Sequence, residues 1–288
     1  MSGLMRARGA AFAVPAVVGG LWVQAQRAAH APLPMFDDQD LSGYYGGRPK
    51  GPPAASRPTR IAVVGDSTMT GPGLDSARDI FVAQAAARLG ARVHLTRFAV
   101  GGARIADVLM HQLPAILDAR PDVAVVSIGA NDVIHSTPLV QFERDFRSVI
   151  GALDRADIET VVCGVLDLSV VPRIPTALKP MLGLRSAAYE RRKRRAIHPA
   201  ARAAYVGASR PVNEMFRARG EAFFTTDRFH PNAAGHRCLA DGLTPHLKAA
   251  VRRARDRADG AMLAQWLTPS FTNAPIMSRR SPTTVLMH

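Results

Sequence analysis

Two widely separated segments carry side chains that could together form a nucleophilic catalytic site. Asp227 and His230 lie three residues apart, directly before Pro231, so a carboxylate and an imidazole can face one neighbouring group. Ser67 lies far upstream in Gly65-Asp-Ser-Thr68, where a β-branched apolar run ends. A serine hydroxyl attacks a carbonyl carbon when a base removes its proton. We therefore predict Ser67 as the nucleophile, His230 as the base and Asp227 as the group that orients the imidazole.

Acyl transfer also needs hydrogen-bond donors for the oxyanion of the tetrahedral intermediate. The candidates are the backbone N–H groups of Ser67 and Gly102 and the side-chain amide of Asn131, and each follows a predicted strand. In an open parallel sheet, ligands bind at the carboxyl ends of the strands, where these groups can meet. Simpler roles compete with this interpretation. Ser67 could cap a helix, Asn131 could cap a loop and Gly102 could serve a tight turn.

The elements that must position these residues alternate between strand and helix. Strands are predicted at residues 60–64, 91–98, 123–128, 159–164 and 203–206, and helices at 76–89, 105–117, 139–155, 185–197 and 232–255. This rhythm predicts an α/β fold in which helices cover both faces of a mostly parallel sheet of about five strands. Residues 168–184 contain three prolines and are expected to form an irregular segment and part of a pocket wall.

Four short blocks carry a family resemblance: Gly65-Asp-Ser-Thr68, Ala99-Val-Gly-Gly102, Gly129-Ala-Asn-Asp132 and Asp227-Arg-Phe-His-Pro231. In this order they resemble the SGNH hydrolase superfamily, also called GDSL esterases and lipases. The resemblance implies a flavodoxin-like three-layer α/β/α sandwich and ester hydrolysis without a cofactor. It also implies a triad of Ser67, His230 and Asp227 and an oxyanion hole of Ser67, Gly102 and Asn131. One departure is Arg97, where many relatives have an asparagine, and it concerns the packing of the local loop more than the catalysis.

The composition suits a globular enzyme domain, and the charge pattern argues against nucleic-acid binding as the main role. The chain has 288 residues, 47% of them hydrophobic, and a formal net charge of +14. Much of the charge is scattered arginine, apart from the dense run Arg191–Arg195, and no nucleic-acid-binding motif accompanies it. We interpret this run as a solvated helix face or a patch near anionic lipid. The histidines show no metal-ligand spacing, so neither a metal nor another cofactor is predicted.

The two ends of the chain differ in composition from the segment between them. Arg6 and Arg8 precede an uncharged run from residue 9 to 26, so residues 1–30 are predicted as a signal peptide or membrane anchor. A Pro/Gly-rich linker is expected at 31–58, the hydrolase domain at 59–258 and a poorly ordered tail at 259–288. The protein is accordingly expected to be exported or membrane-anchored, the alternative being a cytoplasmic protein with a frayed leader.

The sequence predicts a serine hydrolase that cleaves an acyl ester through an acyl-Ser67 intermediate. The first alternative is a carbohydrate O-acetylesterase or acyltransferase acting on envelope glycans. The second is a catalytically inactive SGNH-like domain that binds lipid or glycan. A third makes the basic run primary, as a membrane-surface or nucleic-acid module. The expected partner is a small-molecule, lipid or glycan ester, and the acyl length, the alcohol part and the oligomeric state stay open.

Overall fold

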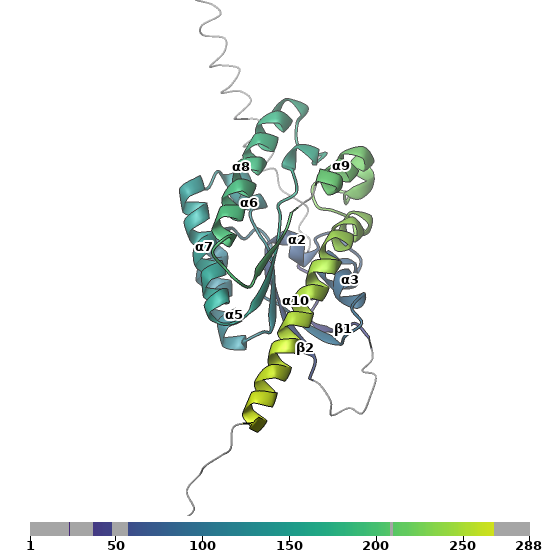
Figure 1. The fold of residues 1–288 in the computed structure, drawn as a ribbon. Coiled ribbons are helices and arrows are strands. Elements are labelled where there is room, and N and C mark those ends of the chain that lie inside the picture. The colour runs from purple at the N-terminus through teal and green to yellow at the C-terminus, as the bar shows by residue number, and fades with distance from the viewer. Residues whose placement is uncertain (1–22, 24–36, 48–56, 208–209, 268–288) are drawn as a thin grey trace, which may run out of the picture.

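A six-stranded, mostly parallel sheet forms the centre of the computed structural model, which describes residues 23, 37–47, 57–207 and 210–267 (Figure 1). The strands are β1 (Gly43–Tyr45), β2 (Thr59–Gly65), β3 (Val93–Arg97), β4 (Val123–Ser127), β5 (Glu159–Cys163) and β6 (Ala203–Val206). Their spatial order is β1-β3-β2-β4-β5-β6, and all neighbours are parallel except β1, which pairs antiparallel with β3. The order of the parallel strands is that of a flavodoxin-like sheet, which confirms the predicted fold class.

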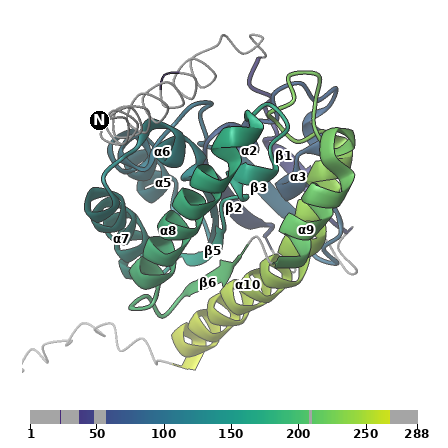
Figure 2. The same cartoon turned by 90° about the horizontal axis from the view of Figure 1, so that it is seen from above.

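Helices cover both faces of the sheet, and Figure 2 shows the two layers on opposite sides of the strands. Every residue of β4 and of β5 is buried, as expected for strands covered on both faces. One layer holds α5 (Leu113–Ala119), α7 (Leu139–Arg155) and α8 (Lys179–Ile197), and the other holds α3 (Phe81–Ala87) and α10 (Ala233–Leu267). The sheet is therefore the middle of three layers.

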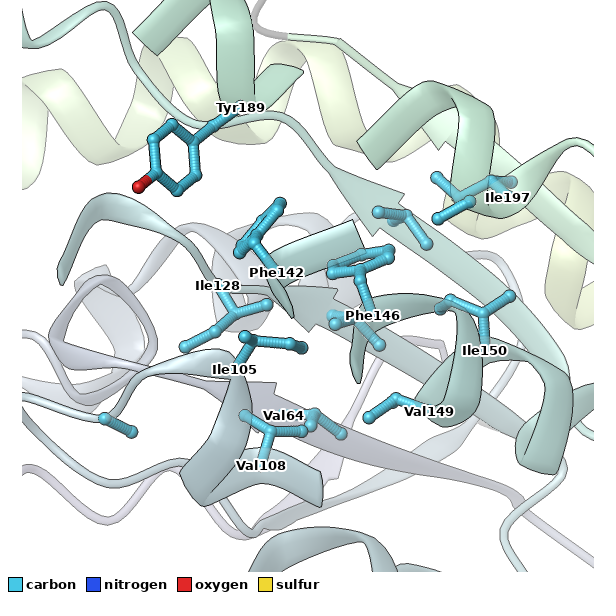
Figure 3. Packing of buried hydrophobic residues seen from close by; sticks show 14 of the residues in the cluster. Val64, Ile105, Val108, Ile128, Phe142, Phe146, Val149, Ile150, Tyr189 and Ile197 are labelled. Atoms are coloured by element: carbon cyan, nitrogen blue, oxygen red, sulfur yellow. The ribbon is translucent and has the colours of Figure 1, made fainter. Parts of the chain in front are cut away.

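Helix α7 shows how the sequence pattern builds one of these layers. Its buried side chains include Phe142, Phe146, Val149 and Ile150, which recur at the three- and four-residue spacing of a helix face. Figure 3 shows these side chains facing Val64 of β2 and the helix and loop residues around it. The prediction for this helix, residues 139–155, matches the structure residue for residue.

The predicted linker is partly wrong, because residues within 31–58 belong to the sheet. Strand β1 lies in this segment, and Leu41 just before it is fully buried in the core of the α3 and α10 side. Tyr45, the last residue of β1, is also buried, and its hydroxyl donates to the carbonyl of Leu41 at 2.9 Å. A three-residue edge strand is too short to show the alternation by which strands are recognised in a sequence.

Three further boundaries differ from the predictions. Helix α10 continues to Leu267, past the predicted start of the tail at residue 259. Helix α8 already begins at Lys179, inside the segment expected to be irregular, and Pro180 lies in its first turn, where proline is tolerated. The predicted helix at 105–117 is divided into α4 (Ile105–Asp107), a π-helical turn η2 (Val108–Gln112) and α5.

Several short elements were not predicted at all. They are α2 (Ser67–Thr70), α6 (Ala130–His135), α9 (Arg210–Arg219) and the 3₁₀ turns η3 (Leu168–Val170), η4 (Thr176–Leu178) and η5 (Gly220–Phe223). The helix predicted at 76–89 is instead divided into the 3₁₀ turn η1 (Ala77–Asp79) and α3. The predicted leader, apart from Val23, and residues 268–288 of the predicted tail lie outside the described residues. Among the helices that are described, none is long and apolar enough to cross a membrane.

Candidate active site

The candidate site lies at the carboxyl end of the sheet, where the strand order changes direction at β2 (Figure 1). Chain segments leaving β2, β3 and β4 carry Ser67, Gly102 and Asn131, respectively. In open α/β sheets this switch point is where ligands bind, because the loops from neighbouring strands diverge there. The fold thus places the candidate residues of three separate sequence blocks at one end of the sheet.

The turn that carries Ser67 depends on a glycine and a buried carboxylate. Gly65 ends β2 with a φ of 144°, and a Cβ at this position would come within 1.8 Å of the carbonyl oxygen of Ser127. Only glycine fits such a close approach without displacing the backbone. Asp66 is buried and caps α2 by accepting a hydrogen bond from the Thr68 N–H at 3.0 Å. Burial raises the pKa of the Asp66 carboxyl, and these contacts hold Ser67 at the start of the short helix.

Gln112 adds a contact to this turn that sequence reasoning missed. Its side-chain amide accepts from the N–H of Gly65 at 3.0 Å and donates to the carbonyl of the same residue at 2.9 Å. Gln112 is buried and ends the π-helical turn η2. This π turn interrupts the helix predicted at 105–117, and such turns are often found at functional sites. It brings the amide to the peptide that lies two residues before Ser67.

Asp227 and His230 share a tight turn that binds the carboxylate from several sides. The hydroxyl of Thr225 donates to Asp227 Oδ1 at 2.6 Å, and the N–H groups of Phe229 and His230 donate to the same oxygen at 2.7 and 2.9 Å. Arg228 has a left-handed φ of 59°, which lets the chain reverse between the acid and the base. The turn therefore fixes the carboxylate against the backbone beside the imidazole.

A continuous chain of contacts joins Asp227, His230 and Ser67. Asp227 Oδ2 lies 2.6 Å from His230 Nδ1, and His230 Nε2 lies 3.1 Å from Ser67 Oγ. Burial alone would raise the pKa of Asp227, but the hydrogen bonds from His230, Thr225 and the backbone lower it well below its usual value. With an ionised carboxylate at Nδ1, the neutral imidazole keeps its proton there and presents Nε2 as an acceptor to the serine hydroxyl.

Asn131 and Asp132 both bind the loop that follows β3. Asn131 Nδ2 donates to the carbonyl of Ala103 at 3.1 Å, and Asp132 Oδ2 accepts from the N–H of Ile105 at 3.0 Å. Asp132 is fully buried, and this burial raises its pKa. Asp132 thus braces the loop. Gly102 is exposed in the same loop with a φ of 77°, next to the residue that Asn131 binds.

An apolar pocket opens beside the Ser67–His230 contact. Asn131 lines it together with these two residues, whereas Gly102 is not among the described residues of its wall. Its walls come from the ends of β4, β5 and β6 and from α9 and α10, and they are mainly aliphatic and aromatic. Within the described part of the chain, no group of three or more His, Cys, Asp or Glu side chains could hold a metal ion.

The basic run Arg191–Arg195 is not wholly a solvated face, so that interpretation is wrong for Lys193. This lysine is fully buried, and its Nζ donates to the carbonyls of Ile128 at 2.8 Å and Cys163 at 3.1 Å. It also lies 3.5 Å from Glu190, whose carboxylate accepts from the Val165 N–H at 2.7 Å. Helix α8 therefore holds together the chain segments that leave β4 and β5.

An α/β sandwich with this strand order and a serine, histidine and aspartate in contact at its switch point defines an SGNH-type ester hydrolase. The chain belongs to the GDSL-like lipase/acylhydrolase family, whose model matches residues 63–238. It is 29% identical over 237 residues to a GDSL-like esterase from Mycobacterium tuberculosis, a match that covers 76% of this chain and 72% of the relative. The resemblance found in the sequence is thereby confirmed.

Solved structures show the same fold at low sequence identity. The crystal structure of TesA matches with a TM-score of 0.54 and 22% identity, covering 67% of this chain and 99% of TesA. The acetylxylan esterase Axe2 from Geobacillus stearothermophilus matches with a TM-score of 0.51 and 16% identity, covering 64% of this chain and 92% of the esterase. At these identities the likeness concerns the fold alone.

Proposed function

We propose that this esterase cleaves its substrate through a covalent acyl intermediate on Ser67. The observation that carries the proposal is the contact chain in which His230 Nε2 lies 3.1 Å from Ser67 Oγ and Nδ1 lies 2.6 Å from Asp227 Oδ2. A base within hydrogen-bond reach of a hydroxyl, itself oriented by a carboxylate, is the arrangement that activates a serine. The geometry supports these roles for Ser67, His230 and Asp227.

The reaction proceeds in two displacement steps. In the first, Ser67 Oγ attacks the ester carbonyl carbon while His230 Nε2 takes the hydroxyl proton, and the imidazolium is stabilised by the carboxylate of Asp227. Collapse of the tetrahedral intermediate breaks the bond to the alcohol, which leaves with the proton from His230. In the second step His230 deprotonates a water molecule, which attacks the carbonyl carbon of acyl-Ser67. The bond from this carbon to Ser67 Oγ then breaks, Oγ takes the proton back from His230, and the carboxylic acid is released.

The oxyanion of each tetrahedral intermediate needs fixed donors, and we assign this role to the N–H groups of Ser67 and Gly102 and to the amide of Asn131. Asn131 uses one N–H on the Ala103 carbonyl, and a primary amide has a second one to offer. That contact also ties the loop of Gly102 to Asn131. We expect Asn131→Ala to lower kcat about 100- to 1,000-fold, the usual loss for one oxyanion donor.

The proposal is tested by labelling with a fluorophosphonate probe and by hydrolysis of p-nitrophenyl acetate. Ser67→Ala should abolish both, and His230→Ala should abolish labelling while Ser67 is still present. Ser148→Ala is the matched control, because Ser148 is exposed on α7 and lies far in sequence from Ser67, Asp227 and His230. Full esterase activity in Ser67→Ala would rule out this nucleophile. Absence of labelling and hydrolysis in the wild type would favour a binding domain without catalysis.

We also propose that residues 1–30 direct export or tether the protein to a membrane. The support is the uncharged run from residue 9 to 26 behind Arg6 and Arg8. Fractionation of cells that express the full chain or a chain lacking residues 1–30 tests this. The full chain should be found in the membrane or exported fraction, and the shortened chain in the cytoplasm. Equal distribution of the two would contradict the proposal.

A further inference from the structure

The apolar pocket beside Ser67 extends under the carboxyl ends of β5 and β6, away from the contact chain. Val165 and Leu166 follow β5, Val206 ends β6, and Leu239 and Leu243 project from α10. The cavity has a volume of about 90 Å³. It is therefore a recess with its own walls, which begins at the nucleophile and continues between the sheet and α10.

The recess offers an occupant apolar contact and few hydrogen bonds. The N–H of Gly164 is used by the carbonyl of Val206 at 2.8 Å, and the N–H of Val165 is used by Glu190 at 2.7 Å. Cys163 lines the same recess, and burial raises the pKa of its thiol to about 12, so the group is uncharged at neutral pH. A sugar ring would lose hydrogen bonds to water here without replacing them, whereas an alkyl chain would not.

We propose that this recess binds the alkyl chain of the acyl group and that it selects esters of short aliphatic acids. The inference rests on the proposed acyl-Ser67 mechanism, because the carbonyl must lie at Ser67 while the chain enters the recess. The volume of the recess sets the length of the alkyl chain that it can hold. An apolar cavity of about 150 Å³ holds one benzene molecule, so 90 Å³ corresponds to roughly four carbon atoms of the acyl group.

Gly242 is a position in the wall of the recess at which a substitution can change the space for the alkyl chain. It lies on α10 between Leu239 and Leu243, on the helix face that lines the recess. A Cβ added to Gly242 would meet no heavy atom within 4 Å, so a side chain there enters open space. A larger residue at this position would fill the recess, while removal of the Leu239 side chain would enlarge it.

The experiment compares kcat/KM for p-nitrophenyl acetate, butanoate, hexanoate, octanoate and dodecanoate. Burial of each methylene should raise kcat/KM about fourfold, which gives about 15-fold from acetate to butanoate. The series should reach its maximum between butanoate and hexanoate and fall for longer chains. Gly242→Leu should lower the butanoate-to-acetate ratio at least fivefold, and Leu239→Ala should move the maximum to a longer chain.

Gly151→Leu is the matched control. Gly151 lies inside helix α7, and a Cβ there also meets no heavy atom within 4 Å, but it does not line the recess. In this variant the butanoate-to-acetate ratio of kcat/KM should equal that of the wild type. Thermal unfolding of both leucine variants shows whether they are folded, and Leu239→Ala gives an independent readout if Gly242→Leu is not.

Two outcomes would overturn the inference while leaving the proposed mechanism intact. One is a wild type that prefers acetate to butanoate although a fluorophosphonate still labels Ser67. The other is a chain-length preference that is the same in Gly242→Leu, Leu239→Ala and the wild type.

A parallel series of acetate esters with alcohols of increasing length tests the other half of the substrate. A preference for long alcohols that Gly242→Leu removes would assign the recess to the alcohol instead.

Discussion

Replacement of the buried Lys193 by methionine should destabilise the protein and disturb the segments that lead to the pocket. Lys193 is fully buried, and its Nζ donates to the carbonyls of Ile128 and Cys163 and lies 3.5 Å from Glu190. Ile128 precedes the turn that carries Asn131, and Cys163 lines the pocket. Loss of the ammonium group would thus release two loops that face the substrate.

The expected loss of stability follows from the charge of Glu190, which remains when Lys193 is replaced. At 3.5 Å and an effective dielectric constant of about 20, the attraction between Lys193 and Glu190 is about 5 kcal/mol, before the cost of removing both from water. Breaking such a pair by removing one partner typically costs about 3–5 kcal/mol, because the other charge stays behind. Methionine has a similar length and leaves no large cavity. Since domains are stable by about 5–15 kcal/mol, the variant should still fold.

Urea unfolding and esterase kinetics together test this reasoning. Lys193→Met should lose about 3–5 kcal/mol in the free energy of unfolding, and kcat/KM should fall at least tenfold. The double variant with Glu190→Gln should regain part of the stability, because the amide oxygen can still accept from Val165 but carries no charge. Arg191→Met, at an exposed position of the same helix, should change the stability by less than about 0.5 kcal/mol. A loss in Lys193→Met no larger than in this control would refute the argument.

Three other perturbations have definite expected outcomes. Asp227→Asn should lower kcat about 10⁴-fold in the assay with p-nitrophenyl acetate, because the amide no longer selects the tautomer of His230 that accepts the serine proton. Gln112→Leu should cost about 1–3 kcal/mol in urea unfolding and slow fluorophosphonate labelling, because the N–H of Gly65 loses its partner at 3.0 Å. Burial lowers the pKa of His236 to about 3, so between pH of about 6.5 and 3 the unfolded chain binds a proton that the folded protein excludes. The free energy of unfolding should therefore fall by up to about 1.4 kcal/mol per pH unit on acidification, and His236→Gln should flatten this dependence.

The convergence of the candidate site residues could be predicted because it depends on strand ends. A buried strand is visible as an apolar run, and the carboxyl ends of parallel strands meet at one edge of the sheet. Ser67 and Asn131 follow such runs, so their convergence required no knowledge of the loops. The contact between His230 and Ser67 joins residues 163 positions apart, and no local pattern contains that distance. It was the combination of blocks, rather than any one of them, that indicated it.

The burial of Lys193 was missed although the sequence contains a signal for it. Tyr189, Lys193 and Ile197 recur at intervals of four, and all three are buried on α8. This spacing is that of an inward helix face, but a run of five basic residues suggested a solvated one. The composition of a charged run therefore does not decide which of its members faces the core, and the helical period has to be applied to charged residues as well.

The contacts of Arg97 explain why the segment before residue 59 belongs to the same structural unit as the predicted hydrolase domain. The N–H of Arg97 donates to Ser42 Oγ at 3.1 Å, and its guanidinium donates to the Ala99 carbonyl at 3.1 Å and to Asp38 at 3.4 Å. The same Asp38 oxygen accepts from the N–H of Gly101 at 3.1 Å, one residue before Gly102. An arginine at this position reaches across to a carboxylate that a shorter side chain would not contact. The loop that carries a proposed oxyanion donor is thus braced by residues before β2, and the structural unit that supports the site includes Asp38, upstream of residue 59.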